Sequence, residues 1–261
     1  MFRAGLLLGL VLVVGSIGAC SSSASGPAKL TVFGASSLTE TLTDLANLWH
    51  AAHPSNELEI STGSSAALRI QIEQGAPADV FLSADTTNPQ LLVDGGLANG
   101  PLTAFARNSL TIIVPASNPA RIASALDLAK PGVCVIAAGD DVPITLYANK
   151  LVGTLATLPG YGQAFADGYA ANICTREDNV GAVVSKVALG EGDAAIVYIA
   201  DADGTGVTSI DVPADANVVA TYGAVAIKNS IAPALAVEFL AWLRGADAQT
   251  MLAAHGFGTA P

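Results

Sequence analysis

Two pairs of adjacent serines are the first candidates for chemistry in this sequence. Ser36 and Ser37 stand in "FGASSLTE", and Ser64 and Ser65 stand in "STGSSAALRIQIE". Each pair follows an apolar run and precedes a helical spacing of apolar residues, so each lies where a predicted strand ends and a helix begins. A serine at such a junction often caps the helix. Helix starts also expose N–H groups, so two such junctions on neighbouring strands predict neutral hydrogen-bond donors for an oxyanion.

A nucleophilic serine is the alternative use of these hydroxyls, and it requires a nearby base. The motifs Gly-x-Ser-x-Gly and Ser-x-x-Lys do not occur in the sequence. His50 and His53 fall late in a predicted helix, and His255 falls in the C-terminal tail. The first two have metal-ligand spacing, but no cysteine or acid cluster accompanies them, so we predict surface residues. A serine hydrolase that uses Ser37 or Ser65 therefore remains an alternative without an identified base.

The elements that position these serines alternate regularly between strand and helix. The first series contains strands in "KLTVFGA", "NELEISTG" and "ADVFLSA", with helices in "SLTETLTDLANLWHAAHP" and "SAALRIQIEQG". A second series contains strands in "VCVIAAG", "ANICTRED" and "AAIVYIADA", with helices in "TLYANKLVGTL" and "NVGAVVSKVALGEG". Such alternation predicts βαβ units and mostly parallel sheets.

Long β segments near residues 110 and 220 separate the two series, and two helical segments end the chain. We therefore predict an α/β protein with two lobes, each a mostly parallel sheet flanked by helices. Lobe 1 comprises residues 29–110 plus 220–261, and lobe 2 comprises residues 111–219. Ligands of such open sheets bind beyond the carboxyl ends of the strands, which here is the cleft between the lobes.

The N-terminus has the pattern of an export signal. The segment "MFRAGLLLGLVLVVGSIGAC" contains one Arg, an apolar run and then small residues, which predicts a signal peptide over residues 1–19. Cys20 directly follows the small residues and precedes the polar run "SSSASGP", a pattern that resembles the lipobox of bacterial lipoproteins. We predict a lipidated tether over residues 20–28 and anchoring to the outer face of the cell membrane, on the periplasmic or cell-wall side. Ordinary cleavage that discards Cys20 is the alternative.

Composition and charge limit the partners. Apolar residues make up 51% of the 261 residues and charged residues 13%, which is ample for a folded core. Removal of the signal peptide leaves ten basic and 22 acidic residues, a net charge of −12. Such an acidic chain is not suited to nucleic acid, and a site for small anions must overcome long-range repulsion by local donors. No phosphate-binding glycine motif is present, and we predict no cofactor.

Apart from Cys20, the sequence contains two cysteines, Cys134 and Cys174. They lie in the predicted strands that lead toward Ile144 and into Asn179. If these strands are neighbours, the spacing suits a disulfide, and export removes the cytosolic reductants. Two buried thiols on opposite faces of the strands are the alternative.

Four stretches of the sequence carry a resemblance to one family: "TVFGASSLTE", "TGSSAALRIQIEQGAPADVFLSAD", "DVPITLYANKLV" and "EDNVGAVVSKVALGEGDAAIVY". Together they resemble the molybdate-binding proteins of bacterial ABC transporters, over residues 29 to 258. The resemblance implies the type II periplasmic-binding-protein fold and no enzymatic activity. It implies that a monomer captures molybdate or tungstate and delivers it to a membrane permease. The same fold with sulfate or another tetrahedral oxyanion is the alternative.

The resemblance also implies which groups bind the oxyanion. Molybdenum is then held only as its oxyanion, without direct protein–metal ligands. A cage of donors accepts a fully deprotonated anion and disfavours one that carries a proton, as phosphate does near pH 7. Cavity size then separates molybdate and tungstate from the smaller sulfate. The implied donors are the hydroxyls of Ser37, Ser65 and Tyr198, the backbone N–H of Ile144, and a backbone N–H of Asn179 or Val180.

Overall fold

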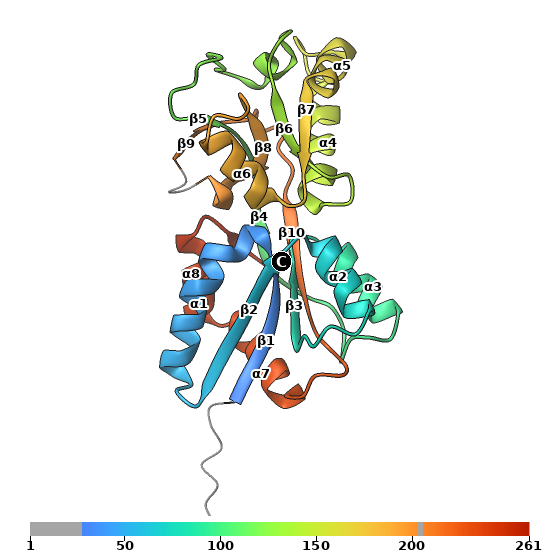
Figure 1. Cartoon of the computed structure of the whole chain (residues 1–261), viewed down its shortest axis with the longest axis vertical. Coiled ribbons are helices and arrows are strands. Elements are labelled where there is room, and N and C mark those ends of the chain that lie inside the picture. The colour runs from blue at the N-terminus through green and yellow to red at the C-terminus, as the bar shows by residue number, and fades with distance from the viewer. Residues whose placement is uncertain (1–27, 203–205, 261) are drawn as a thin grey trace, which may run out of the picture.

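The computed structural model describes residues 28–202 and 206–260. The predicted signal peptide and the predicted lipidation site Cys20 lie outside the described residues. The described chain forms two bodies stacked end to end (Figure 1). We call the six-stranded sheet with helices α1–α3, α7 and α8 lobe 1, and the two smaller sheets with helices α4–α6 lobe 2. Over the part of the chain described here, no helix is both long and apolar enough to cross a bilayer.

Lobe 1 contains a mixed sheet with strand order β11-β4-β10-β3-β1-β2. The first βαβ units give parallel pairing of β1 with β2 and of β1 with β3. The remaining pairs are antiparallel because β10 returns from lobe 2 in the opposite direction and inserts between β3 and β4. The prediction of a mostly parallel sheet therefore holds only for the first three strands. The strands are β1 (Ala28–Ala35), β2 (Asn56–Gly63), β3 (Val80–Ser83), β4 (Thr103–Asn108), β10 (Ala220–Ala226) and β11 (Gly258–Thr259).

Helices cover both faces of this sheet, because alternate residues of each strand point to opposite sides. In β1, Leu30 and Val32 face one core, whereas Phe33 faces the other. The first core contains side chains of α1, α7 and α8, and the second contains side chains of α2 and α3. The helices are α1 (Thr39–Ala52), preceded by the 3-10 turn η1 (Ser36–Leu38), α2 (Ser65–Glu73), α3 (Thr87–Asp94), α7 (Pro233–Leu243) and α8 (Ala246–Ala254).

Lobe 2 divides its strands between two sheets. Strands β8, β5 and β9 form an antiparallel sheet, and β6 pairs with β7 in parallel. A single bridge between Val135 and Ala194 connects the two sheets. The prediction of a mostly parallel sheet is thus met here only by β6 and β7, because β5 and β9 belong to the connections between lobes. The strands are β5 (Leu110–Pro115), β6 (Val135–Ala138), β7 (Ile173–Glu177), β8 (Ala195–Tyr198) and β9 (Val207–Ile210).

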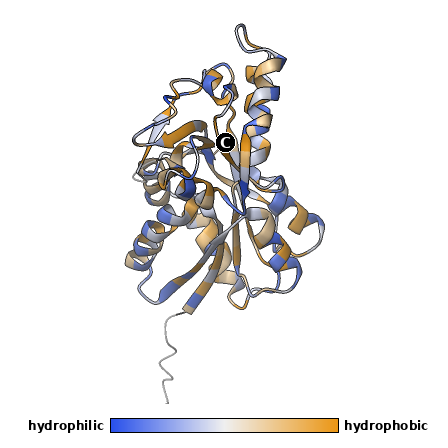
Figure 2. Ribbon diagram, turned by 45° about the horizontal axis from the view of Figure 1, so that its top comes forward, coloured by the Kyte–Doolittle hydropathy of each residue, from blue (hydrophilic) through white to orange (hydrophobic). Residues whose placement is uncertain are grey.

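The helices of lobe 2 are α4 (Pro143–Leu155), α5 (Gln163–Ala171) and α6 (Val180–Ala188), with 3-10 turns η2 (Ala125–Ala129) and η3 (Ile199–Asp201). In both lobes the helices carry hydrophilic as well as hydrophobic residues (Figure 2), as expected of helices with one face on the core and one in solvent. The predicted helices and strands that lead to the serines and to Tyr198 are all present.

Two chain segments connect the lobes and run side by side. Asn108, the last residue of β4, pairs with Ala220 at the start of β10. Just beyond, the side chain of Asn217 accepts a hydrogen bond from the N–H of Leu110 at 3.0 Å and donates one to its carbonyl at 2.9 Å. The two connections are therefore held together as one narrow ribbon, so any change in the angle between the lobes must occur in both at once.

Candidate functional site

A small cavity lies where the strand ends of lobe 1 face two helix starts of lobe 2. It is about 10 Å³ in volume, which is room for roughly one water-sized group. The cavity is lined by Ala35, Ser36, Ser37, Gly63, Ser64, Ser65, Ala84, Val142, Pro143, Ile144, Val180 and Tyr198. Five of the six residues implied by the resemblance are in this set; Asn179 is not.

Ser37 lies in the turn that follows β1, and its hydroxyl does not cap a helix. The N-cap position of the turn is Ala35, and no side-chain cap bond is formed there. Instead, Ser37 Oγ is 2.9 Å from the Tyr222 hydroxyl. Burial raises the pKa of Tyr222 well above its usual value, so this phenol stays protonated. Ser37 is thus held at the cavity wall by a buried neutral partner.

The second serine pair lies at the start of α2. Ser65 Oγ accepts a hydrogen bond from the N–H of Ala84 at 3.1 Å, so its own proton is available to a ligand. Ser64 stands at the N-cap position but makes no side-chain cap bond. Its Oγ is buried and has no hydrogen-bond partner among the described residues. Because a buried unpaired hydroxyl costs free energy, Ser64 is a further candidate donor, one that is not among the donors implied by the resemblance.

Lobe 2 contributes the N-terminal ends of α4 and α6. Ile144 is the second residue of α4, after Pro143, and Val180 is the first residue of α6. Backbone N–H groups in the first turn of a helix have no acceptor within the helix. Within the described chain, the N–H groups of Ile144 and Val180 make no hydrogen bond outside it either. Because both helix N-termini face one cavity, the positive ends of two helix dipoles favour an anion there.

The side chain of Asn179 caps α6. Its backbone is extended, at φ −162°, and its side-chain Oδ1 accepts a hydrogen bond from the N–H of Ala182 at 3.0 Å. It is the N-cap of α6. The cap fixes the start of the helix and so places the adjacent N–H of Val180, which lines the cavity. Of the two residues left open by the sequence, the geometry favours Val180.

Tyr198 ends β8 and supplies the third hydroxyl. Its side chain is buried, and its hydroxyl has no hydrogen-bond partner among the described residues. Burial raises its pKa well above the usual value, so it can act as a neutral donor. Its ring packs edge-to-face against Tyr222, with ring centres 5.6 Å apart. A buried tyrosine normally pairs its hydroxyl, and the unpaired one here points to an occupant of the cavity.

None of the residues that line the cavity is charged. A wider groove of about 290 Å³ lies beside it, shares Ser36 and Ser37 with it, and contains Glu40 and Asp201. Asp201 is half-buried as a residue, but its Oδ2 is buried without a partner in the described chain. Burial, with a smaller contribution from Glu40, raises the pKa of Asp201 to about 7. An anion in the cavity thus meets neutral donors first, and a carboxyl only in the adjoining groove.

The histidines do not support serine nucleophiles. His255 is 3.0 Å from Asp44, His53 is 3.4 Å from Glu238, and His50 contacts the carbonyl of Asn56. No histidine is among the residues that line the cavity. Across residues 28–202 and 206–260, no group of three or more His, Cys, Asp or Glu side chains is arranged to hold a metal ion. The cavity can therefore bind an anion through hydrogen bonds, but it lacks the base that acyl transfer needs.

Comparison with known proteins agrees with this geometry. The family model for bacterial extracellular solute-binding proteins matches residues 30–258. The chain belongs to this family. It is 34% identical to the molybdate-binding protein ModA of Mycobacterium tuberculosis (strain ATCC 25618 / H37Rv), over 97% of each chain. These are binding proteins of transport systems rather than enzymes, so the hydrolase alternative is set aside.

Solved structures show the same fold. The periplasmic molybdate-binding protein of Azotobacter vinelandii superposes with a TM-score of 0.75 at 26% identity, covering 87% of this chain and 98% of that one. The sulfate-binding protein SubI of Mycobacterium tuberculosis H37Rv also gives 0.75, at 20% identity, covering 88% and 86%. The second likeness shows the fold alone. The predicted two-lobe α/β binding-protein fold is confirmed.

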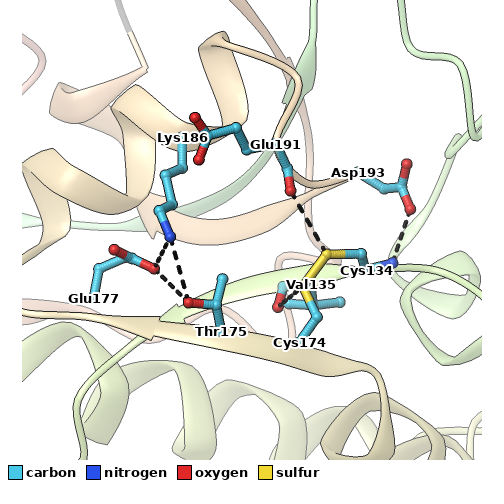
Figure 3. The surroundings of a disulfide bond; sticks show 8 residues. All are labelled: Cys134, Val135, Cys174, Thr175, Glu177, Lys186, Glu191 and Asp193. Carbon is cyan, nitrogen blue, oxygen red and sulfur yellow. Dashed lines mark hydrogen bonds and ion pairs between the residues drawn. A yellow bond between two sulfur atoms is a disulfide. The ribbon is translucent and has the colours of Figure 1, made fainter.

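A disulfide lies behind the helix starts of lobe 2. Cys134 and Cys174 are joined, with Cα atoms 5.3 Å apart (Figure 3). Asp193 accepts a hydrogen bond from the N–H of Cys134 at 2.8 Å. Glu177 of the neighbouring strand β7 forms a 2.8 Å ion pair with Lys186 of α6, and this pairing lowers the pKa of the Glu177 carboxyl. The strands that lead to α4 and α6 are thus tied to each other and to α6.

Sequence reasoning missed two partners of the serines, Tyr222 and Ala84. Tyr222 lies in an apolar β segment without a motif, and Ala84 directly follows β3; they contact Ser37 and Ser65 only through the fold. The single available signal was the tyrosine within "NVVATYGAVAIKN", a polar hydroxyl in a segment predicted to be buried.

Proposed function

We propose that this protein captures molybdate, and tungstate in the same way, outside the cytoplasm and delivers it to the permease of an ABC transporter. The observation that carries the proposal is the cavity between the lobes, whose available polar groups are neutral donors on both sides. Membership of the solute-binding family and the names of the molybdate-binding relatives support the same ligand.

The donor set favours a particular class of anion. Each charge-assisted hydrogen bond contributes about 1.5–3 kcal/mol. Six or so such bonds can offset desolvation and lobe closure and leave a binding free energy of about −8 kcal/mol or better, which is submicromolar affinity. Molybdate, tungstate and sulfate are fully deprotonated near neutral pH and need only donors. Phosphate retains a proton, which in this cavity meets other donors.

We assign the ligand contacts to the hydroxyls of Ser37, Ser65 and Tyr198 and to the N–H groups of Ile144 and Val180. The positions of these residues around one cavity support the assignment. The Ser64 hydroxyl is a further contact in this scheme because it too lacks a partner in the described chain. Asn179 contributes by capping α6 and not by contacting the anion.

The proposal extends to the rest of the chain. Residues 1–19 form the signal peptide, Cys20 carries the lipid, and residues 20–28 connect it to the fold, which acts as a monomer. Lobe 1 consists of residues 29–110 and 220–261, and lobe 2 of residues 111–219. The lobes close on the anion by bending the paired connections near residues 110 and 220. Small-angle scattering tests the closure: molybdate should reduce the radius of gyration, and an unchanged radius argues for a rigid site.

Isothermal titration calorimetry of the mature protein without its lipid tests the ligand. Molybdate, tungstate, sulfate and phosphate are titrated in turn at pH 7.5, with perchlorate as an anion of lower charge. We expect submicromolar affinity for molybdate and tungstate and much weaker binding of phosphate. Tight binding of sulfate with weak molybdate would reassign the protein to sulfate, and absence of binding to all four would refute the proposed function. A thermal-shift series checks the result, because binding stabilises the fold by about 4 kcal/mol at a thousandfold excess over Kd.

A further inference from the structure

The hydrogen bond between Tyr222 and Ser37 connects the cavity wall to the middle of the lobe 1 sheet. The two oxygens are 2.9 Å apart and belong to residues 185 positions apart in the chain. Tyr222 is fully buried on β10, where the pairing with β4 shifts register. Its ring packs edge-to-face against Phe105, Tyr198 and Phe257. Packing on three sides therefore fixes the position of this hydroxyl relative to Ser37.

The chemistry of the pair determines which residue donates. A phenol is a stronger donor and a weaker acceptor than an alcohol, because its oxygen lone pair is delocalised into the ring. Among the described residues, Ser37 Oγ is the one hydrogen-bond partner of the Tyr222 hydroxyl. The amide of Asn108 is close enough to influence that hydroxyl but makes no hydrogen bond of normal geometry. If Ser37 donated, the phenolic proton would have no acceptor in a hydrogen bond of normal geometry among the described residues. Tyr222 therefore donates and Ser37 accepts.

Ser65 has the same arrangement from an unrelated partner. Its Oγ accepts from the backbone N–H of Ala84 at 3.1 Å, and an N–H can only donate. Both serines thus receive one hydrogen bond from a fixed donor behind them and keep their own protons for the cavity. A side-chain hydroxyl fixes Ser37, whereas the main chain fixes Ser65, so only the first of these partners can be removed by a side-chain substitution that leaves the backbone unchanged.

A hydroxyl oxygen that already accepts one hydrogen bond becomes a stronger donor and a weaker second acceptor, because each bond polarises the next. At Ser37 this polarisation favours an anion that needs a donor. It disfavours an anion whose own O–H needs an acceptor. The effect depends on the protonation state of the anion and not on its size.

We propose that Tyr222 is a positioning residue that orients and polarises the Ser37 hydroxyl as a donor, and thereby makes the site selective for fully deprotonated oxyanions. The inference rests on the proposed function, since it concerns how that site discriminates between anions. If Tyr222 only filled the core, its substitution would change the affinity for every anion by the same factor. A selective change is therefore expected only for a positioning role.

The experiment measures the affinities of molybdate, sulfate and phosphate for wild type, Tyr222→Phe, Ser37→Ala and the double variant, at pH 7.5. Phosphate and sulfate are measured by displacement of molybdate. They are similar in size but differ in that phosphate carries a proton. Tyr222→Phe should weaken molybdate and sulfate by the same factor, about tenfold, the loss of roughly one hydrogen bond's contribution, and should leave phosphate unchanged or slightly tighter. In the Ser37→Ala background, Tyr222→Phe should change molybdate affinity less than about twofold, because the two residues act in series.

The matched control is Tyr169→Phe, which removes the hydroxyl of a different buried tyrosine, located in lobe 2. It should leave all three affinities unchanged. Equal weakening of all three anions by Tyr222→Phe, or additive effects in the double variant, would overturn the proposal in favour of a packing role. Thermal melts of each variant show whether the fold is intact. If wild type binds none of the anions, the proposed function fails and this inference fails with it. That result differs from equal weakening or additive effects, which would refute only the role of Tyr222.

Discussion

Lobe 1 and lobe 2 present different kinds of donor to the same cavity. Lobe 1 presents serine hydroxyls, and behind two of them lies a fixed partner, Tyr222 for Ser37 and the Ala84 N–H for Ser65. Lobe 2 presents backbone N–H groups at the starts of α4 and α6, together with the unpaired hydroxyl of Tyr198. The hydroxyl donors depend on side chains and can be removed one at a time. The backbone N–H donors of lobe 2 depend on where a helix begins.

The frameworks behind the two donor sets differ as well. In lobe 1 a continuous six-stranded sheet supports the serine turns. In lobe 2 the strands that lead to α4 and α6 form a two-stranded sheet, attached to its neighbour by one bridge and closed by the Cys134–Cys174 disulfide. Two parallel strands alone are a weak unit. Lobe 2 therefore relies on a covalent bond and an ion pair, where lobe 1 relies on strand pairing.

The largest expected effect comes from removing both lobe 1 hydroxyls. Ser37→Ala with Ser65→Ala should weaken molybdate binding by about 3–6 kcal/mol, since each charge-assisted bond contributes about 1.5–3 kcal/mol. Calorimetry measures the loss, and a urea titration shows whether the fold is retained. Ser185→Ala, in the adjoining groove and not in the cavity, is the control. Molybdate affinity equal to that of wild type would show that the serines do not contact the anion.

Removal of the disulfide probes the weaker framework of lobe 2. Replacing Cys134 and Cys174 by alanine should lower the free energy of unfolding by about 3–4 kcal/mol on the chain-entropy estimate for a sequence separation of 40. Denaturant titration of oxidised wild type and of the variant gives the difference. Hydrogen exchange should speed up in β6 and β7 and stay unchanged in β1 to β3. Equal loss of protection in both lobes would contradict the distinction between the two frameworks.

Backbone donors can be tested by proline. Val180 is the first residue of α6 and follows an extended residue, so proline fits there without breaking the helix. Val180→Pro removes the N–H and should weaken molybdate binding by about 1.5–3 kcal/mol. Val180→Ala keeps the N–H and serves as the matched control; it should cost much less in affinity. Similar losses in both variants would mean that packing, and not the N–H, is what matters at this position.

The smallest expected effect concerns the carboxyl in the groove between the lobes. Burial raises the pKa of Asp201 from its ordinary value of 3.8 to about 7. Between these pH values the folded state holds more protons than the unfolded state, so this group makes stability fall as pH rises from about 4 through 7. Asp201→Asn should remove that dependence and stabilise the protein at pH 8 by about 1–2 kcal/mol, discounted for partial exposure. Urea titrations of both proteins at pH 5 and pH 8 measure it.

The matched control for the pH series is Glu40→Gln. Glu40 lies in the same groove, on the lobe 1 side. It contributes only the smaller share of the Asp201 shift, so it should change the pH dependence less. Identical pH dependence of wild type and Asp201→Asn would show that this carboxyl is adequately solvated in solution.

Much of this organisation was predictable from the sequence, because alternation and helical spacing report burial directly. The strands before both serine pairs and the helices after them follow from period 2 and period 3.6. Several short elements, among them α3, α5 and β9, did not follow from these patterns. Helix α3 buries Asn88 and Pro89 with Leu92 and so lacks a clear apolar stripe. Strand β9 is a four-residue edge strand without a fully buried residue.

The proposed ligand positions were predictable only where they lie next to a motif. Ser37, Ser65 and Val180 lie at element boundaries that the sequence marks. The role of Tyr222 depends on a contact across 185 positions, and the unpaired state of the Ser64 hydroxyl depends on surrounding atoms. The sequence left open whether Asn179 or Val180 supplies the backbone N–H, and the 3.0 Å bond from Ala182 that makes Asn179 the cap of α6 depends on the folded helix start.

The insertion of β10 between β3 and β4 has a consequence for the order in which the protein folds. Lobe 2 consists of one uninterrupted stretch of chain, whereas the lobe 1 sheet needs β10, which is synthesised and exported after nearly all of the chain. Contacts within one stretch close shorter loops and form sooner. Until residue 226 has emerged, β3 and β4 each have an unpaired edge, which is a site for aggregation. Pulse-labelled hydrogen exchange during refolding should therefore protect β5 and β8 before β10, whose partners in β3 and β4 are more distant along the chain. A chaperone that shields strand edges during export would act on lobe 1.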